Sequence, residues 1–226
     1  MANSNFLRRN KNQHRIKNSI SKRMDSNIDI AVNRLISLLR KKYPKFTFEH
    51  KKKLFLTEII SDLSRHYLGY EKSFADVMEK SFIKPDGGFL YAKDDKGKRR
   101  IILISEVKRQ GTNDKRLKEG LKKQAKGNAI ERLGKNLTGI RAIFKQESII
   151  PFVCFGSGDD FKDKSTIRDR VITMNDFFPL NKMFLEKSHL PFEPVSMFFR
   201  YRDWSIKEMV DIMTNLAEEA IHHYFT

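Results

Sequence analysis

The chain has 226 residues, with 45 Lys and Arg against 28 Asp and Glu, so its formal net charge is +17. This length suits one domain, or one domain with a basic tail, and the hydrophobic content of 39% is enough to build a core. A positive excess of this size favours a polyanionic partner, and nucleic acid and an anionic membrane surface are the two candidates.

The sequence holds no apolar stretch close to the roughly 20 residues that cross a bilayer, and no signal-peptide core follows its N-terminus. The single cysteine, Cys154, lies in the apolar run "IIPFVCF" and is expected to be a buried thiol. One cysteine allows no disulfide within the chain, which fits a reducing cytoplasm. We therefore expect a cytoplasmic protein that binds nucleic acid and has no membrane partner.

Residues 1–25 are expected to form a basic, mobile arm, because the first 24 residues contain seven Lys and Arg and no acid. Such an arm can follow phosphates or can simply aid solubility. Residues 26–226 are expected to form a single domain. Within it, the spacing of apolar residues predicts helices from Ser26 to about Tyr43, from Phe48 to Tyr67 and from Phe74 to Lys80.

The pattern then changes to that of strands. "GFLYAK" and "RRIILISEV" flank the turn-forming "DDKG", so Gly88 to Val107 is predicted to be a β-hairpin. "IIPFVCFG" is predicted to be a buried strand, and helices are predicted from Gly127 to Phe144 and over "WSIKEMVDIMTNLAEEAIHHYF". This order of elements predicts an α/β fold in which helices flank a central mixed β-sheet.

Two acids and a lysine border the predicted hairpin. Asp86 stands just before its first strand and Glu106 near the end of its second, so the two carboxylates can meet at one edge. Glu106 and Lys108 are two apart on a strand and share a face. Two carboxylates with room for water suit Mg²⁺, and a lysine beside them can position a water or neutralise charge on a phosphate. A salt bridge on an edge strand explains the same pattern equally well.

A second Glu-x-Lys triplet, formed by Glu49, His50 and Lys51, has no partnering Asp and falls in a predicted helix. We interpret it as solvated surface. The helix predicted from Gly127 carries an apolar stripe, and Asn128, Glu131 and Arg132 fall on its opposite face. Such side chains near a helix N-terminus can bind base edges in the major groove. An ordinary solvated face is the alternative.

The segments "IKPDGG", "SEVKRQG" and "GNAIER" together resemble the EcoRI/MunI-type type II restriction endonucleases of the PD-(D/E)xK superfamily. The likeness covers most of residues 26–161 and fades over 162–200. It implies a PD-(D/E)xK nuclease core in which Asp86, Glu106 and Lys108 are catalytic. It also implies that Asp86, Glu106 and the carbonyl of Val107 hold a Mg²⁺ cofactor.

The resemblance further implies a homodimer that cuts both strands of a palindrome in double-stranded DNA and leaves 5′-phosphates and AATT overhangs. A cognate DNA methyltransferase is implied as a partner in the same system, without a stable complex. The residues that the resemblance assigns to DNA binding are Lys126, Gly127, Asn128, Ala129, Glu131, Arg132 and Arg109.

The outer base pair of the site depends on Lys126. The stretch between Lys108 and Gly127 is short for EcoRI, and "EVKRQ" is closer to MunI. The likeness to MunI, a relative that cuts CAATTG, implies CAATTG ahead of GAATTC, with Lys126 binding the outer guanine at O6 and N7. If Lys126 contacts only phosphate, a bare AATT site follows. A sequence-specific DNA binder without cleavage and a structure-selective repair nuclease of the same superfamily are the alternative functions.

Overall fold

The structure is a computed structural model that describes residues 4–66, 80–109, 111, 113–118, 120, 128–163, 165, 180–186 and 194–226. Within these ranges it does not describe the side chains of residues 4–22, 62, 63, 65, 66, 113, 115, 116, 128–132 and 135. The elements are α1 (Ser4–Lys42), β1 (Thr47–Lys51), β2 (Leu54–Phe55), α2 (Leu56–His66), β3 (Phe82–Ile83), β4 (Gly88–Lys93), β5 (Arg99–Arg109), α4 (Asn113–Lys118), α5 (Asn128–Ile143), β6 (Phe152–Ser157), the 3₁₀ helix η1 (Asp159–Phe161), β7 (Ser196–Arg200) and α7 (Ile206–Phe225).

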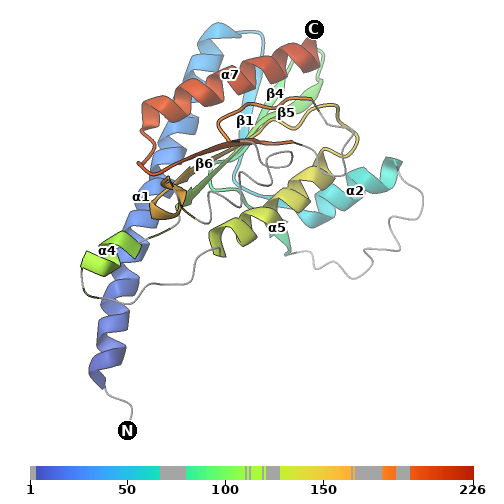
Figure 1. Cartoon of the computed structure of the whole chain (residues 1–226). Coiled ribbons are helices and arrows are strands. Elements are labelled where there is room, and N and C mark those ends of the chain that lie inside the picture. The colour runs from blue at the N-terminus through green and yellow to red at the C-terminus, as the bar shows by residue number, and fades with distance from the viewer. Residues whose placement is uncertain are drawn as a thin grey trace.

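A mixed sheet forms the centre of the molecule (Figure 1). Over the described residues its strand order is β1-β4-β5-β6-β7, with β2 and β3 forming a separate two-stranded ribbon. The pairs β1–β4 and β4–β5 are antiparallel, whereas β5–β6 and β6–β7 are parallel. Strand β5 is therefore the central strand, where the antiparallel and parallel halves of the sheet meet. The predicted mixed α/β sheet with flanking helices is confirmed.

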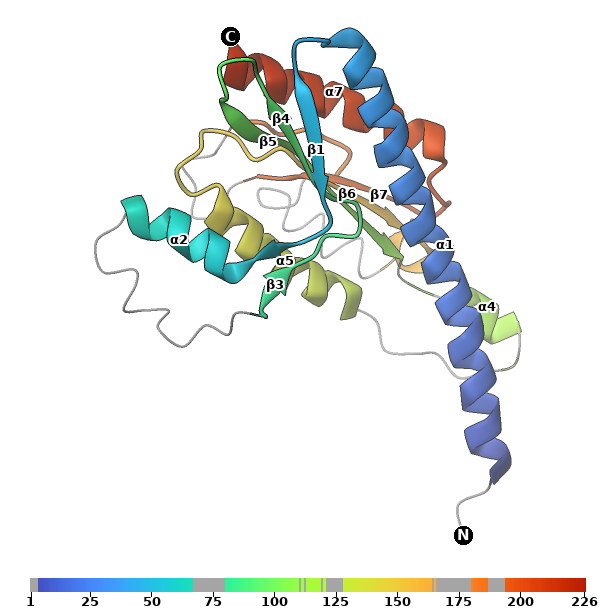
Figure 2. The ribbon, with the colours of Figure 1, turned by 180° about the vertical axis from the view of Figure 1, so that it is seen from behind.

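Helices cover both faces of the sheet (Figures 1 and 2). Helices α1 and α7 pack together on one face, where an apolar cluster includes Leu35, Val107 and Met213. Helices α2 and α5 lie on the other face, where a second cluster includes Ile104 and Leu137. Burial of these two apolar surfaces is the main force that stabilises the layered arrangement.

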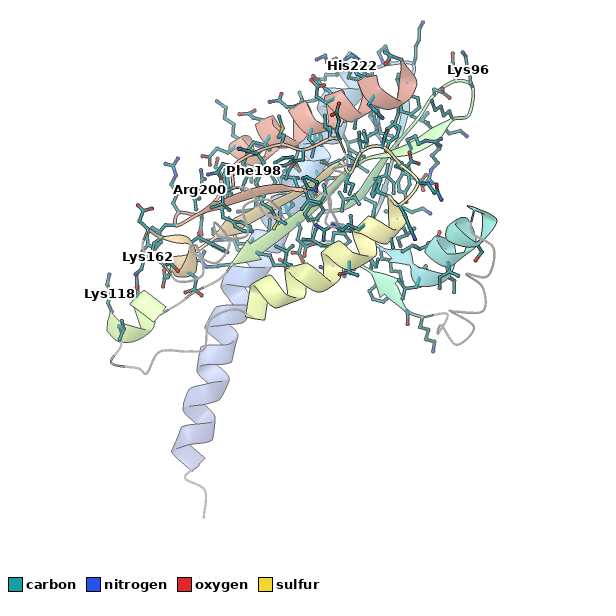
Figure 3. All side chains as sticks on the ribbon, turned by 45° about the vertical axis from the view of Figure 1, so that its right-hand side comes forward. Lys96, Lys118, Lys162, Phe198, Arg200 and His222 are labelled. Carbon is teal, nitrogen blue, oxygen red and sulfur yellow. The ribbon has the colours of Figure 1, made fainter. Side chains whose placement is uncertain are left out.

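The hairpin prediction is confirmed. Strands β4 and β5 pair from Gly88 opposite Ser105 to Lys93 opposite Arg99, with a register shift between Leu90 and Tyr91. The turn between the two strands is closed by a hydrogen bond from the main-chain N–H of Lys98 to Asp94 Oδ1. This end of the sheet carries Lys96, which Figure 3 labels at the opposite end of the molecule from Lys162.

The buried strand and the final helix are also confirmed. The strand runs over Phe152–Ser157 as β6, and Cys154 within it is fully buried as expected. Helix α7 begins after the N-cap residue Ser205, whose side chain accepts a hydrogen bond from Glu208 N. The Glu208 carboxylate in turn accepts a hydrogen bond from the Ser205 main-chain N–H, which completes a capping box.

The helix predicted from Phe48 to Tyr67 is wrong in its first half. Residues Thr47–Lys51 form the edge strand β1, and the helix occupies only Leu56–His66. Phe48 is buried while Thr47 and Glu49 are exposed, which is the period-two alternation of a strand. Pairing with β4 outweighs the weak local preference of this segment.

Two other boundaries differ from the predictions. Helix α1 begins at Ser4 instead of near Ser26, so residues 4–42 form one continuous helix whose N-terminal part extends beyond the sheet (Figure 2). Strand β7 (Ser196–Arg200) was not predicted, because a run of five residues gives too short a pattern to identify. The helix predicted from Phe74 to Lys80 lies almost entirely outside the described residues, and the division at residue 25 stays a prediction. In the part of the chain that is described, we find no helix long and apolar enough to cross a membrane.

Candidate active site

Asp86 lies in the tight turn that leads into β4. The turn is closed by a hydrogen bond of 3.1 Å from Gly88 N to Pro85 O, and Gly88 has a φ of 76°. That left-handed conformation favours glycine because a Cβ there is strained. Gly87 N also donates to Ser105 O at 2.9 Å, which joins the turn to β5. The sequence "PDGG" therefore fixes Asp86 at the end of the hairpin that is remote from the Lys96 turn.

Glu106 and Lys108 project from β5 on the same face, and the structure brings both to Asp86. Lys108 Nζ donates to Asp86 Oδ2 at 3.1 Å and forms a short ion pair with Glu106 Oε1. The main-chain N–H of Asp86 donates to Glu106 Oε2 at 3.0 Å, and Val107 N donates to Asp86 Oδ2 at 3.3 Å. The three side chains thus form one connected cluster.

The three side chains of the cluster differ in burial, and this difference affects their pKa values. The side chain of Glu106 is 1% exposed, that of Lys108 16% and that of Asp86 29%. Burial raises the pKa of Glu106, and Asp86 adds to that rise, whereas the neighbouring Lys108 opposes it. Burial alone lowers the pKa of Lys108, but the carboxylates of Glu106 and Asp86 outweigh it and the pKa is raised. Lys108 is therefore held as a cation beside the two acids.

Two further residues were missed by the sequence analysis: Asn136 contacts the cluster itself, and His50 contacts the turn that carries Asp86. His50, interpreted there as solvated helix surface, lies on β1, and its Nε2 is 2.8 Å from Gly87 O, next to Asp86. Asn136 lies on α5, and its Nδ2 donates to Glu106 Oε1 at 2.9 Å. No pattern in the sequence identifies either contact, because the partners are 37 and 30 positions apart.

The predicted DNA-binding residues are placed only in part. Asn128, Ala129, Glu131 and Arg132 belong to the first turns of α5, where the backbone is described and the side chains are not. Lys126 and Gly127 lie outside the described residues. Arg109 Nη1 forms a close ion pair with Asp203, which also accepts from Arg23 Nη2 at 3.3 Å. The Arg109 guanidinium is thus paired with Asp203, a residue that precedes α7.

The donor set fits a hard divalent cation. No group of three or more His, Cys, Asp or Glu side chains that could hold a metal occurs among the residues that the structure describes. Mg²⁺, however, commonly binds proteins through one or two carboxylates and keeps several waters. Asp86 and Glu106 provide such a pair, and the partial exposure of Asp86 leaves access for water and phosphate.

A mixed sheet flanked by helices, with an acid pair and a lysine at the end of its central hairpin, is the architecture of a PD-(D/E)xK nuclease core. The sequence profile of the family described as "Restriction endonuclease EcoRI" matches residues 10–168. The chain belongs to the EcoRI restriction endonuclease family.

Two curated relatives carry the names of restriction enzymes. The chain is 33% identical over 145 residues to the type II restriction enzyme EcoRI of Escherichia coli, an alignment that covers 59% of this chain and 52% of the relative. It is 35% identical over 96 residues to the type II restriction enzyme RsrI of Cereibacter sphaeroides, covering 39% of this chain and 35% of the relative. The matched part thus spans about half of the first relative and about a third of the second.

Proposed function

We propose that the chain is a type II restriction endonuclease that cuts both strands of a palindromic DNA site containing AATT. The observation that carries the proposal is the cluster of Asp86, Glu106 and Lys108 at the end of the central hairpin, in a chain of this family. The names of the two relatives support it, and the net charge of +17 suits a DNA substrate.

The chemistry that these residues support is hydrolysis of a phosphodiester. Asp86, Glu106 and the carbonyl of Val107 would hold Mg²⁺, which supplies Lewis-acid polarisation of the phosphate when bound. Lys108 would orient the attacking water or balance the negative charge that develops on the phosphate. The water oxygen bonds to phosphorus, the bond from phosphorus to the 3′ oxygen breaks, and protonation of that oxygen leaves a 3′-hydroxyl and a 5′-phosphate.

Recognition is assigned to the start of α5. Asn128, Ala129, Glu131 and Arg132 would contact the AATT core, with Lys126, Gly127 and Arg109 as further DNA contacts. We favour CAATTG, then GAATTC, then a bare AATT site, because "EVKRQ" and the short stretch after Lys108 resemble MunI, and Lys126 could bind the outer guanine. A homodimer fits a palindrome, because its two-fold axis would place one active site on each strand.

The test is a digest of sequenced phage DNA with Mg²⁺, in which the fragment ends are mapped, with Asp86→Ala as the negative control. Discrete ends with AATT overhangs would support the proposal, and the flanking bases would distinguish the three sites. Intact DNA together with a specific gel shift on AATT duplexes would instead indicate a DNA binder that does not cut. Cuts placed by DNA shape without a common sequence would indicate a structure-selective nuclease. Persistent cutting by Asp86→Ala would refute the assigned metal site.

A further inference from the structure

Asn136 is a polar residue at the border of an apolar helix surface. Its neighbours Leu133 and Leu137 are buried against the sheet, and Asn136 itself is partly buried. A partly buried amide is unfavourable in a helix unless it has a hydrogen-bond partner. That partner is Glu106 Oε1, at 2.9 Å.

Glu106 is bound from three parts of the fold. Its Oε2 accepts from the main-chain N–H of Asp86 in the turn, and its Oε1 accepts from Lys108 on its own strand. The third donor is the Asn136 amide, which comes from helix α5 packed against the sheet. Because Glu106 is 1% exposed, water cannot replace a lost donor easily. The orientation of this carboxylate therefore depends on where α5 lies.

Helix α5 also carries the segment to which base recognition is assigned. Arg132 and Asn136 are four apart and so lie on adjacent turns of the same helix side. The distance along the axis between them is about 6 Å at the usual rise per residue. A shift of α5 as its first turns seat on DNA would reach Asn136 directly, because a packed helix moves as a rigid element.

We propose that Asn136 is a positioning residue that couples the seating of α5 on the correct DNA sequence to the placement of Glu106 for metal binding. This inference rests on the proposed function of the same site. It assigns to Asn136 no contact with DNA, metal or the reacting atoms. Its effect passes through the hydrogen bond from the Asn136 amide to Glu106.

The test compares Asn136→Leu, which keeps the branched shape of the side chain and removes the donor, with Thr138→Val on the same helix. Thr138 is exposed and its hydroxyl donates to Gly134 O on its own helix at 3.0 Å, so its variant controls for loss of a polar group from α5. The first readout is the affinity for a fluorescent AATT duplex, with Ca²⁺ and with EDTA. Coupling between two binding sites is reciprocal. If bound DNA raises the affinity of the site for the metal ion, the metal ion must raise the affinity for DNA by the same factor.

We expect Ca²⁺ to strengthen duplex binding by the wild type and by Thr138→Val. In Asn136→Leu most of this gain should be lost, because removing a residue that orients a metal ligand weakens metal binding about 10- to 100-fold. Its affinity in EDTA should stay unchanged. The proposal would be overturned if Ca²⁺ strengthened duplex binding by Asn136→Leu as much as by the wild type. It would also be overturned if Ca²⁺ had no effect on duplex binding by the wild type. This readout needs no cleavage, so it tests Asn136 even if the chain does not cut DNA.

The second readout is the ratio of cleavage rates on the preferred site and on a duplex with one base pair changed. Coupling predicts that Asn136→Leu loses more rate on the preferred site than on the altered one. Equal loss on both would overturn coupling and leave only a fixed orienting contact. Asn136→Gln, which keeps an amide donor on a longer stem, should recover part of the ratio. If Asn136→Leu is not folded by circular dichroism, the Gln variant and Asn136→Ala carry the same comparison.

Discussion

Asp86 and Glu106 hold each other in place through the main chain. The N–H of Asp86 donates to the carboxylate of Glu106 at 3.0 Å, and the residue after Glu106 donates its own N–H to the carboxylate of Asp86 at 3.3 Å. Each acid is thus oriented by the backbone beside the other. The turn before β4 and strand β5 thus orient the two carboxylates through main-chain donors.

Replacing Asp86 by Asn should abolish cutting while retaining site-specific binding. The amide keeps the size of the side chain, but it removes the charge that a divalent cation and Lys108 both need. We expect a loss of about 10³-fold or more in the single-turnover rate, because removing even one neutral transition-state donor costs about 10²- to 10³-fold. The measurement is cleavage of an end-labelled duplex beside a gel shift. Loss of binding together with cutting would show that Asp86 serves the fold more than the chemistry.

Replacing His50 by Leu should weaken the site without unfolding the protein. The contact of 2.8 Å between His50 Nε2 and Gly87 O anchors the turn that carries Asp86. Its loss should cost about 1 kcal/mol in the free energy of unfolding and raise the Mg²⁺ concentration for half-maximal cutting by about tenfold. His222→Leu is the control, because His222 is exposed in the last turn of α7. An unchanged Mg²⁺ dependence in His50→Leu would limit this histidine to a structural role.

Replacing Gly87 by Ala should destabilise the turn through a steric clash. A Cβ at this position would overlap the Ser105 hydroxyl and lie 2.9 Å from Ile28 Cγ1 on α1. Overpacking of this kind costs about 1–3 kcal/mol, so the melting temperature should fall. The double variant Gly87→Ala, Ser105→Gly removes the nearest obstacle and should recover a large part of the loss. No recovery would place the clash at Ile28 and α1 instead.

Glu208 makes the start of α7 sensitive to acid. The guanidinium of Arg200, bonded to both carboxylate oxygens, lowers the pKa of Glu208, and the Ser205 main-chain N–H adds to the effect. A folded-state pKa below the unfolded one stabilises the fold above the ordinary value of 4.5, and this contribution is lost as the pH falls below it. Glu208→Gln should therefore lower the melting temperature at pH 7 and lower it by less near pH 2. Equal losses at both pH values would contradict a role for the charge.

The hairpin and its acid pair could be predicted from the sequence because they depend on neighbouring segments. "DDKG" forms the turn, apolar runs on both sides form the strands, and antiparallel pairing brings the start of β4 to the end of β5. The shared face of Glu106 and Lys108 follows from the period of two in a strand. The apolar stripe predicted on this helix is likewise confirmed, since Leu133, Leu137 and Ile140 of α5 are buried.

Only the tertiary structure decided which distant residues complete the site. Residues Thr47–Lys51 form a strand because they pair with the edge of β4. In this strand His50, which was expected at the surface, contacts the Gly87 carbonyl. Asn136 met Glu106 because α5 packs on that face of the sheet, and Asp203 met Arg109 because α7 follows β7 at the end of the sheet. These contacts join segments far apart in the chain, so local propensity and periodicity carry no information about them. The sequence by itself determined the family, the central hairpin and its acid pair, and the packing of the layers determined what surrounds that pair.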